Sequence, residues 1–264
     1  MINKIISLSN PLIKNLSSLI DKSKTRINSN TFLIEGVHEI KLAIKAGYSI
    51  NKMFYCPKIY KQDFDWVASD IQLIQISNPI FQKLAYRKKT GGILALANSK
   101  KLELEDLNLK DNSLILVFES IEKPGNIGAM LRTADAANVD AVIICDPITD
   151  LYNPNIIRSS LGCVFTNKIV IASAEKSISF LRARDVKIYS ATLQNSLSYC
   201  SQNYISSTAF VIGNETYGLS DKWRTAPCKN INIPMNGSVD SLNLSVTAAI
   251  LLFEANRQRK KIDI

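Results

Sequence analysis

Histidine is almost absent from the 264-residue sequence, in which only His38 occurs. Cysteine is also sparse, and none of the five forms a C-x-x-C pair: Cys56, Cys145, Cys163, Cys200 and Cys228. One histidine and scattered thiols cannot supply the usual ligand spacing of a zinc site. We therefore expect no metal, and we interpret the cysteines as reduced, buried thiols.

Long apolar runs are missing too, because none reaches the roughly 18 residues that a membrane span needs. The N-terminal stretch MINKIISLSNP has one lysine and a short apolar patch broken by polar residues and proline, which is not the pattern of a signal peptide. A content of 46% hydrophobic residues is typical of a globular protein. The length of 264 residues indicates two domains. We expect a cytoplasmic protein without a membrane partner.

Positive charge is concentrated in one part of the sequence. The net charge is +9, and residues 1–110 hold 17 Lys and Arg against 9 Asp and Glu. Residues 111–264 are nearly balanced, with 15 against 14. This asymmetry suggests that one domain binds a polyanion, although a solvated lysine-rich surface explains the charge equally well.

The first part of the chain predicts a small basic α/β domain over residues 1–105. Asn10 and Pro11 are typical of the start of a helix, and Gly47 closes a second helix over 37–47. Strands are predicted over 31–36, 50–56, 71–76 and 91–97, and a further helix over 78–89. The charged stretch 99–112 is interpreted as a linker. Two basic clusters are the expected phosphate contacts: Lys22, Lys24 and Arg26, and Arg87, Lys88 and Lys89.

Residues 111–264 predict a second α/β domain built on a parallel sheet. Apolar strands are expected over 113–118, 141–145, 168–171, 187–191, 209–212 and 230–234. Ligands of open parallel sheets bind beyond the carboxyl ends of the strands. Three loops at such ends are therefore the places to search for a site.

The first loop lies in ESIEKPGNIGAMLRTADAANVDAVIICD. Its glycines form G-x-x-G rather than G-x-G-x-x-G, and Asp146 follows the next strand. A nicotinamide-dependent dehydrogenase is thus a weak alternative, because the dinucleotide fingerprint is incomplete. Arg132 stands in an alanine-rich helix, where a surface pair with Asp135 would also account for it.

The second and third loops are FVIGNETYGLS and INIPMNGSVDSLNLS. The second places Glu215 between Gly213 and Gly218, and glycine there lets the backbone approach a ligand or simply turn. The third places Ser241 and Asn243 at the mouth of a helix. These two side chains suit capping of the helix and also binding of a polar group at its unpaired N–H groups.

Taken together and in this order, the three loops are specific. NIGAMLRTADA, FVIGNETYGLS and IPMNGSVDSLNLSVTAAILLFE resemble the three signature motifs of the SpoU (TrmH) family of RNA ribose 2'-O-methyltransferases, in the SPOUT superfamily. The resemblance spans about residues 113–260, and FLIEGVHEIKLAIKAG resembles the substrate-binding domain of members that modify ribosomal RNA. It implies a C-terminal SPOUT domain over 111–264 with a trefoil knot, and a homodimer with sites completed across the interface.

The resemblance also implies S-adenosyl-L-methionine as methyl donor. Carried over by motif position, the cofactor residues are Thr192, Gly213, Ile233 and Leu242, and the catalytic residues are Arg132, Asn126, Glu215, Ser241 and Asn243. Arg132 matches an arginine proposed as general base, but a guanidinium with a pKa above about 12 is better suited to orient the ribose or phosphate and stabilise alkoxide charge.

The implied substrate is RNA, with large-subunit ribosomal RNA favoured because tRNA-specific members often lack the N-terminal domain. Two alternatives stay open: a tRNA ribose 2'-O-methyltransferase and a non-catalytic RNA-binding relative. Tyr86, beside Arg87, is a further candidate for RNA contact, since unpaired bases stack on aromatic rings.

Overall fold

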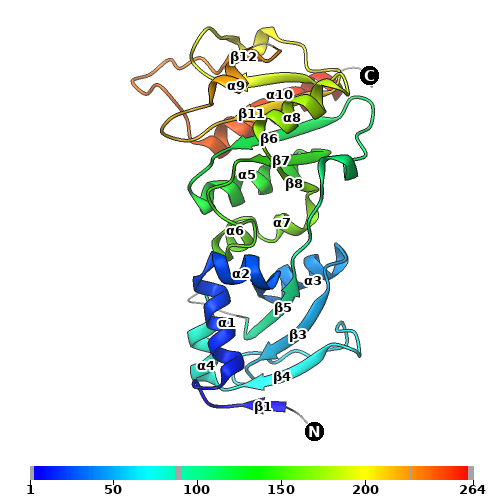
Figure 1. Cartoon of the computed structure of the whole chain (residues 1–264), viewed down its shortest axis with the longest axis vertical. Coiled ribbons are helices and arrows are strands. Elements are labelled where there is room, and N and C mark those ends of the chain that lie inside the picture. Colours follow the sequence, from blue (N-terminus) through cyan, green and yellow to red (C-terminus); the bar gives the residue numbers. More distant parts are fainter. Residues whose placement is uncertain (1–2, 87–90, 226, 261–264) are drawn as a thin grey trace. The chain divides into compact units, whose positions relative to one another are not determined.

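The computed structural model describes residues 3–86, 91–225 and 227–260 (Figure 1). The chain divides into two compact units. The first unit comprises residues 1–100 and 150–166, and the second comprises residues 101–149 and 167–264. Residues 150–166 therefore group with the N-terminal part, although the sequence assigns them to the second domain.

The first unit is a five-stranded mixed sheet with helices on both faces. Its elements are β1 (Asn3–Ile5), α1 (Pro11–Asp21), α2 (Ser23–Ser29), β2 (Thr31–Glu35), α3 (Val37–Lys45), β3 (Ile50–Tyr55), β4 (Gln72–Ile76), α4 (Asn78–Leu84), β5 (Ile93–Asn98), α6 (Pro154–Ser159) and α7 (Cys163–Thr166). The strand order is β1-β4-β3-β5-β2, and β5 runs antiparallel to β3 and β2.

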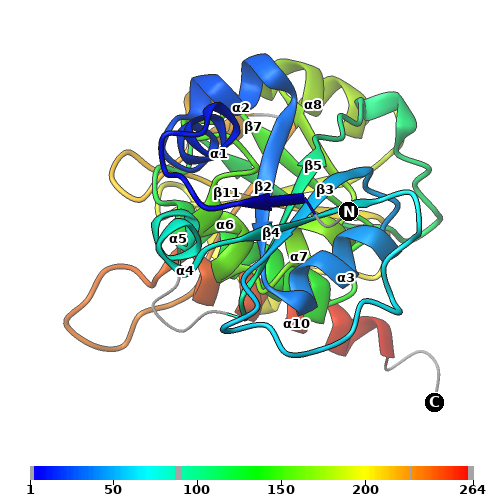
Figure 2. The same cartoon turned by 90° about the horizontal axis from the view of Figure 1, so that it is seen from below.

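Alternating side chains of the strands divide this unit into two cores. Leu33, Phe54 and Ile74 face α1 and α4, whose apolar residues complete one buried cluster. The opposite face is covered by α3 (Figure 2). The predicted helix start is confirmed, because the Asn10 side chain accepts a hydrogen bond from the Leu12 N–H at 2.9 Å. Lys24 and Arg26 of the first basic cluster belong to the helix α2, and Lys22 immediately precedes it.

The structure contradicts the prediction that Arg26 contacts phosphate. Arg26 is buried and forms a two-pronged ion pair with Asp150, with Nε and Nη2 at 2.9 and 2.6 Å from the carboxylate oxygens. Its Nη1 donates to the carbonyls of Leu19 and Ile20. All of its nitrogens are thus occupied inside the unit, so Arg26 attaches residues 150–166 instead of meeting solvent.

An aromatic cluster attaches the same segment a second time. The ring of Tyr152 stacks on Phe32 with centroids 4.1 Å apart, and Phe165 and Tyr48 pack around them. The Tyr152 hydroxyl accepts from the Lys100 N–H and donates to the Lys100 carbonyl, both at 2.9 Å. Residues 150–166 therefore supply part of the hydrophobic core of the first unit.

The second unit is a seven-stranded sheet. Its elements are the 3₁₀ turn η1 (Leu104–Asp106), β6 (Leu114–Glu119), α5 (Pro124–Ala136), β7 (Ala141–Cys145), β8 (Ile169–Ala172), α8 (Ala174–Arg182), β9 (Lys187–Ala191), β10 (Leu197–Ser198), the 3₁₀ turn η2 (Tyr199–Ser201), β11 (Thr208–Ile212), α9 (Asp221–Arg224), β12 (Lys229–Asn232) and α10 (Leu244–Lys260). The order is β10-β12-β9-β11-β6-β7-β8, with every pairing parallel.

All six strands predicted for this unit are confirmed. Both faces of the sheet are covered: α8 and α9 pack on the side of Ile115, Val117 and Val211, whereas α10 packs on β11 and on α5 (Figure 1). The carboxyl ends of β9, β11, β6 and β12 lie at one edge. The loops predicted to carry the site therefore start from neighbouring strands.

The predicted linker over 99–112 is not wholly a linker. Leu104 and Leu107 are buried in the core cluster of the second unit. A capping box between Glu103 and Asp106 closes the turn η1. The alternating leucines of this stretch are thus core residues, hidden in the sequence by the charges between them.

The cysteines are less uniform than expected. Cys56 and Cys145 are buried, and desolvation raises the pKa of the Cys145 thiol to about 12. Cys200 is exposed, so the prediction of a buried thiol is wrong there. Across residues 3–86, 91–225 and 227–260, no group of acidic, histidine and cysteine side chains has the arrangement of a metal site, and no helix is long and apolar enough to span a membrane.

Candidate active site

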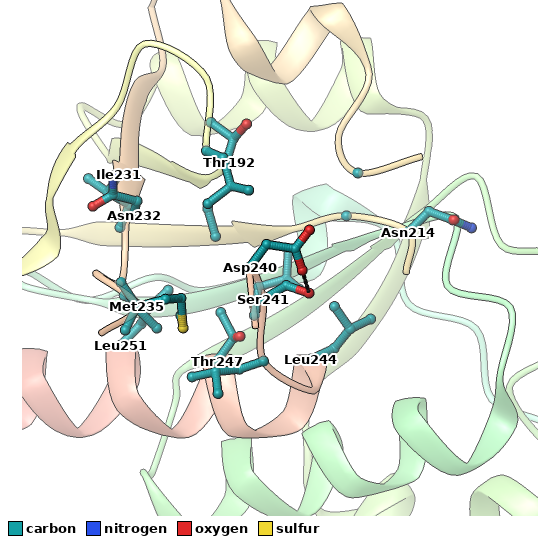
Figure 3. Close-up of a pocket in the computed structure, with 17 residues that line it drawn as sticks. Thr192, Asn214, Ile231, Asn232, Met235, Asp240, Ser241, Leu244, Thr247 and Leu251 are labelled. Carbon is teal, nitrogen blue, oxygen red and sulfur yellow. Dashed lines mark hydrogen bonds between the residues drawn. The ribbon is translucent and has the colours of Figure 1, made fainter. Parts of the chain in front are cut away.

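A cavity of about 130 Å³ opens at the carboxyl edge of the second unit. Its wall is apolar at β11, β12 and α10, and polar side chains stand around its mouth. Figure 3 shows Thr192 on one side of the cavity and Thr247 and Leu251 of α10 on the opposite side. All four cofactor residues predicted from the motifs line this space: Thr192, Gly213, Ile233 and Leu242.

Gly213 is required by the loop that follows it. A Cβ atom at this position would lie 2.4 Å from the Gly218 carbonyl carbon and 2.6 Å from the Leu219 nitrogen. The backbone of Asn214 pairs with that of Gly218 by two hydrogen bonds of 3.1 and 3.0 Å, which folds the loop back on itself. Gly218 has φ +70°, a conformation that favours glycine. The motif glycines thus shape the wall of the cavity.

Replacing Gly213 with alanine is expected to weaken cofactor binding by about 5- to 150-fold, because the loop backbone must move to make room. Isothermal titration with S-adenosylmethionine measures this loss. Gly237→Ala is the matched control, since a Cβ there would meet nothing within 4 Å. Equal affinity of both variants and the unmodified protein would contradict this account of Gly213.

A chain of hydrogen bonds joins the three sequence motifs beside the cavity. The Asn126 Nδ2 donates to Glu215 Oε1 at 2.6 Å, and the Asn243 Nδ2 donates to Asn126 Oδ1 at 3.2 Å. Asn243 Oδ1 accepts from the backbone N–H and the hydroxyl of Ser245 at 2.9 and 2.6 Å. Asn243 therefore caps α10, as predicted, and also holds Asn126, whereas its binding of a ligand stays a prediction.

The Glu215 carboxylate has one unsatisfied oxygen. Glu215 Oε2 is buried and has no hydrogen-bond partner among the described residues. A buried carboxylate oxygen without a donor is costly, at about 1–3 kcal/mol or more. This cluster is therefore arranged to receive a donor from outside it.

Two predicted catalytic residues stand apart from the cluster. Ser241 lines the cavity, and its hydroxyl contacts Asp240 at 3.2 Å rather than capping α10 (Figure 3). Arg132 is exposed on α5 and forms no hydrogen bond or ion pair with another described residue. It lies six positions after Asn126, which places it about 9 Å along the helix and on a different side.

Two residues that the motifs did not single out as ligands hold the second loop. The buried Glu119 accepts hydrogen bonds from the Ser220 N–H and hydroxyl at 2.7 and 2.6 Å. The Asn214 Nδ2 donates to the Ser120 carbonyl at 2.9 Å, and its Oδ1 accepts from the Thr216 N–H at 2.7 Å. The sequence signal for Glu119 is a carboxylate that ends the apolar strand LILVFE.

Comparison with known proteins places this site in a family. A model of the SpoU rRNA methylase family matches residues 113–253, which contain the first two motifs and all but the last residue of the third. The chain belongs to the SpoU rRNA methylase family. A second model, the MRM3-like substrate binding domain, matches residues 10–95. The dinucleotide-binding alternative is therefore discarded.

Curated SpoU relatives align over nearly the whole chain. The 23S rRNA (guanosine(2553)-2'-O)-methyltransferase RlmP of Bacillus subtilis is 31% identical over 95% of this chain and 98% of its own. The 23S rRNA (uridine(2479)-2'-O)-methyltransferase of Streptomyces viridochromogenes is 26% identical over 96% of this chain and 92% of its own.

Solved structures of SpoU-type proteins have the same fold. An RNA 2'-O ribose methyltransferase with 36% identity has a TM-score of 0.85 over 97% of this chain and 99% of its own. The AdoMet-bound rRNA methyltransferase of Sinorhizobium meliloti, at 26% identity, has a TM-score of 0.88 over 97% and 98%. A structure concerned with methylation of C/U34 on tRNA, at 27% identity, covers only 56% of this chain but 97% of its own, with a TM-score of 0.51.

Proposed function

We propose that this protein transfers the methyl group of S-adenosylmethionine to a ribose 2'-hydroxyl of large-subunit ribosomal RNA. The observation that carries the proposal is the hydrogen-bond chain of Asn126, Glu215 and Asn243 beside the apolar cavity. Membership of the SpoU family and the 23S rRNA relatives support the same activity.

The cavity suits S-adenosylmethionine by its lining. It has an apolar wall and few polar groups, which is the usual character of a small-molecule site. Gly213, Ile233 and Leu242 would hold the cofactor through backbone and apolar contacts, and Thr192 would add a hydroxyl. The bound cofactor supplies a methyl group already activated by its sulfonium.

The protein must then align the 2'-oxygen and stabilise the charge that develops on it. Methyl transfer forms an O–C bond, breaks the C–S bond to leave S-adenosylhomocysteine, and passes the hydroxyl proton to an RNA phosphate or to water. The second unit contains no histidine, because His38 belongs to the first unit. We assign Arg132 to stabilising the developing alkoxide or binding the adjacent phosphate. Asn126 and Asn243 would position the Arg132 guanidinium. Ser241 would contact the cofactor or ribose at the mouth of the cavity.

The proposed enzyme is a homodimer that completes each site with Arg132 of a second copy. In one chain Arg132 lies outside the cluster, whereas Glu215 Oε2 lacks a donor. On the neighbouring helix α10, Val246 and Phe253 are 45% and 51% exposed, at a spacing of two turns. Burying this apolar stripe against another copy would stabilise the dimer. The trefoil knot and a cytoplasmic location remain expectations of the same proposal.

The first unit is proposed to bind the RNA. It holds 16 Lys and Arg against 7 Asp and Glu, whereas the second unit holds 16 of each. The entire net charge of +9 therefore belongs to the first unit. Lys22 and Lys24 are exposed and keep their predicted role, while Arg87, Lys88 and Lys89 lie outside the described residues.

Reversing the charge at Lys22 and Lys24 to glutamate is expected to weaken RNA binding by about tenfold or more and to reduce the salt dependence of the affinity. Filter binding over a series of salt concentrations measures both effects. The control is Lys176→Glu with Lys187→Glu, two exposed lysines of the electrically neutral unit. A parallel loss of cofactor binding would indicate a folding role for Lys22 and Lys24 instead.

The substrate class is tested by transfer of labelled methyl groups to total ribosomal RNA and total transfer RNA from cells that lack this gene. We expect label in ribosomal RNA, because the tRNA-related structure covers only 56% of this chain. Label in transfer RNA alone would support the alternative substrate. Cofactor binding with no label in either pool or in ribosomal assembly intermediates would support a non-catalytic RNA-binding role.

A further inference from the structure

The first unit carries an exposed ring and an exposed guanidinium that face each other. Tyr86 follows α4 and is 46% exposed, and the guanidinium carbon of Arg158 on α6 lies 5.7 Å from the centre of its ring. The two residues are 72 positions apart in the sequence. They meet because residues 150–166 belong to the first unit.

Both side chains are held by their surroundings. The Tyr86 N–H donates to Glu35 Oε2 at 2.7 Å, which fixes the backbone that carries the ring. The Arg158 Nη2 donates to Asn155 Oδ1 at 2.9 Å, within the same helix. The other nitrogens of Arg158 form no hydrogen bond to a described residue. The planar guanidinium of Arg158 is therefore held over the ring of Tyr86, and its remaining N–H donors are available to a ligand.

The pair stands at the rim of an apolar hollow. The hollow is small, at about 20 Å³, and is lined by Leu33, Leu94 and Ile157, with the Glu35 carboxylate also present. Its rim is rich in the chemistry that recognises unpaired bases: an aromatic face, a guanidinium plane and a hydrogen-bond acceptor. Lys83, exposed on α4 three residues before Tyr86, adds charge for the RNA backbone.

We propose that Tyr86 and Arg158 form a stacking platform for one unpaired nucleobase of the RNA substrate. The inference rests on the proposed function and adds Arg158, from the chain segment between β7 and β8, to the RNA-binding surface. The positive charge favours a nucleic acid as the ligand, because the first unit holds all of the net positive charge of the protein. A base on this platform would help to set the register of the RNA relative to the methylated ribose.

The experiment uses the full-length protein and a 23S rRNA transcript of the same organism. Tyr86→Ala and Arg158→Ala should each raise the Kd and KM for this RNA by about tenfold, with kcat within about twofold of the unmodified enzyme. Tyr86→Phe and Tyr86→Trp should keep near-normal affinity, since stacking needs the ring alone. Arg158→Lys keeps the charge but loses the planar stack, so it should restore the salt dependence and only part of the affinity.

The salt dependence separates stacking from general attraction. Tyr86→Ala should leave the slope of log K against log salt unchanged, whereas Arg158→Ala should lower it by about one. RNA affinity at the unmodified level in both alanine variants would overturn the platform. The platform would also be overturned if unfolding explained the result. In that case Tyr86→Ala would lose RNA affinity only because its melting temperature falls, and Tyr86→Phe would show the same fall. The proposed function fails separately, through absence of methyl transfer by the unmodified protein.

Discussion

Replacing Arg132 with alanine is expected to lower kcat for methyl transfer by about 100- to 1000-fold, the usual effect of removing one preorganised donor to a developing oxyanion. Cofactor affinity should stay within about twofold, because Arg132 does not line the cavity. Single-turnover transfer of labelled methyl groups to ribosomal RNA measures the rate, and isothermal titration measures the affinity. Arg132→Lys should recover only part of the rate, since it keeps the charge without the fork of donors.

Mixing two inactive variants tests whether Arg132 acts in a second copy. Arg132→Ala and Asn243→Ala place their lesions on α5 and at the start of α10. A mixed dimer would hold one site with both residues intact, so exchange of subunits should restore measurable activity. Absence of recovery after demonstrated exchange would place Arg132 and Asn243 of one chain in the same site. Normal activity of Arg132→Ala alone would remove it from the chemistry.

Replacing Asp150 with alanine is expected to lower the free energy of unfolding of the first unit by about 3–5 kcal/mol, because it leaves the buried Arg26 charge without its partner. The Arg26 and Asp150 side chains are 4% and 8% exposed. Urea unfolding followed by the fluorescence of Trp66, which belongs to this unit, measures the loss. Trp223 should be replaced with phenylalanine in every protein compared, so that the signal comes from one unit.

Asp221→Ala is the matched control for Asp150→Ala. Asp221 also pairs with an arginine, Arg224, but its side chain is 89% exposed, so its removal should cost the second unit at most about 1 kcal/mol. Urea unfolding of this control is followed by far-UV circular dichroism, because Trp66 reports on the first unit alone. Replacing both Arg26 and Asp150 with apolar residues should recover much of the stability lost in Asp150→Ala. A small effect of Asp150→Ala would mean that water reaches Arg26.

The strands could be predicted from the sequence because they depend on local patterns, since an apolar run such as LILVF is buried wherever the chain places it. The resemblance to the SpoU motifs, not a local pattern, singled out Gly213 and Leu242, which line the cavity. The capping role of Asn243 was predictable from its position before an apolar helix. These features need no knowledge of distant contacts.

The predictions that failed concern residues whose contacts are with side chains far away in the sequence. Arg26 resembles its solvated neighbours Lys22 and Lys24 in sequence, and only Asp150, 124 residues away, makes it a buried structural residue. The buried Leu104 was concealed by charges on either side of it. Glu119 was missed because its partner, Ser220, lies 101 residues further along the chain. Pattern predicts burial of apolar residues, but it does not predict which polar residues are paired.

The inclusion of residues 150–166 in the first unit bears on how such proteins can be recombined. A chimera that exchanges only residues 1–100 with a relative would put foreign side chains against Tyr152, Phe165 and Asp150. The exchangeable module is discontinuous, and both of its segments must come from the same parent. If the first unit binds the RNA as proposed, the substrate specificity of this protein depends on two separate stretches of sequence, one of which lies inside residues 113–253 matched by the methylase family.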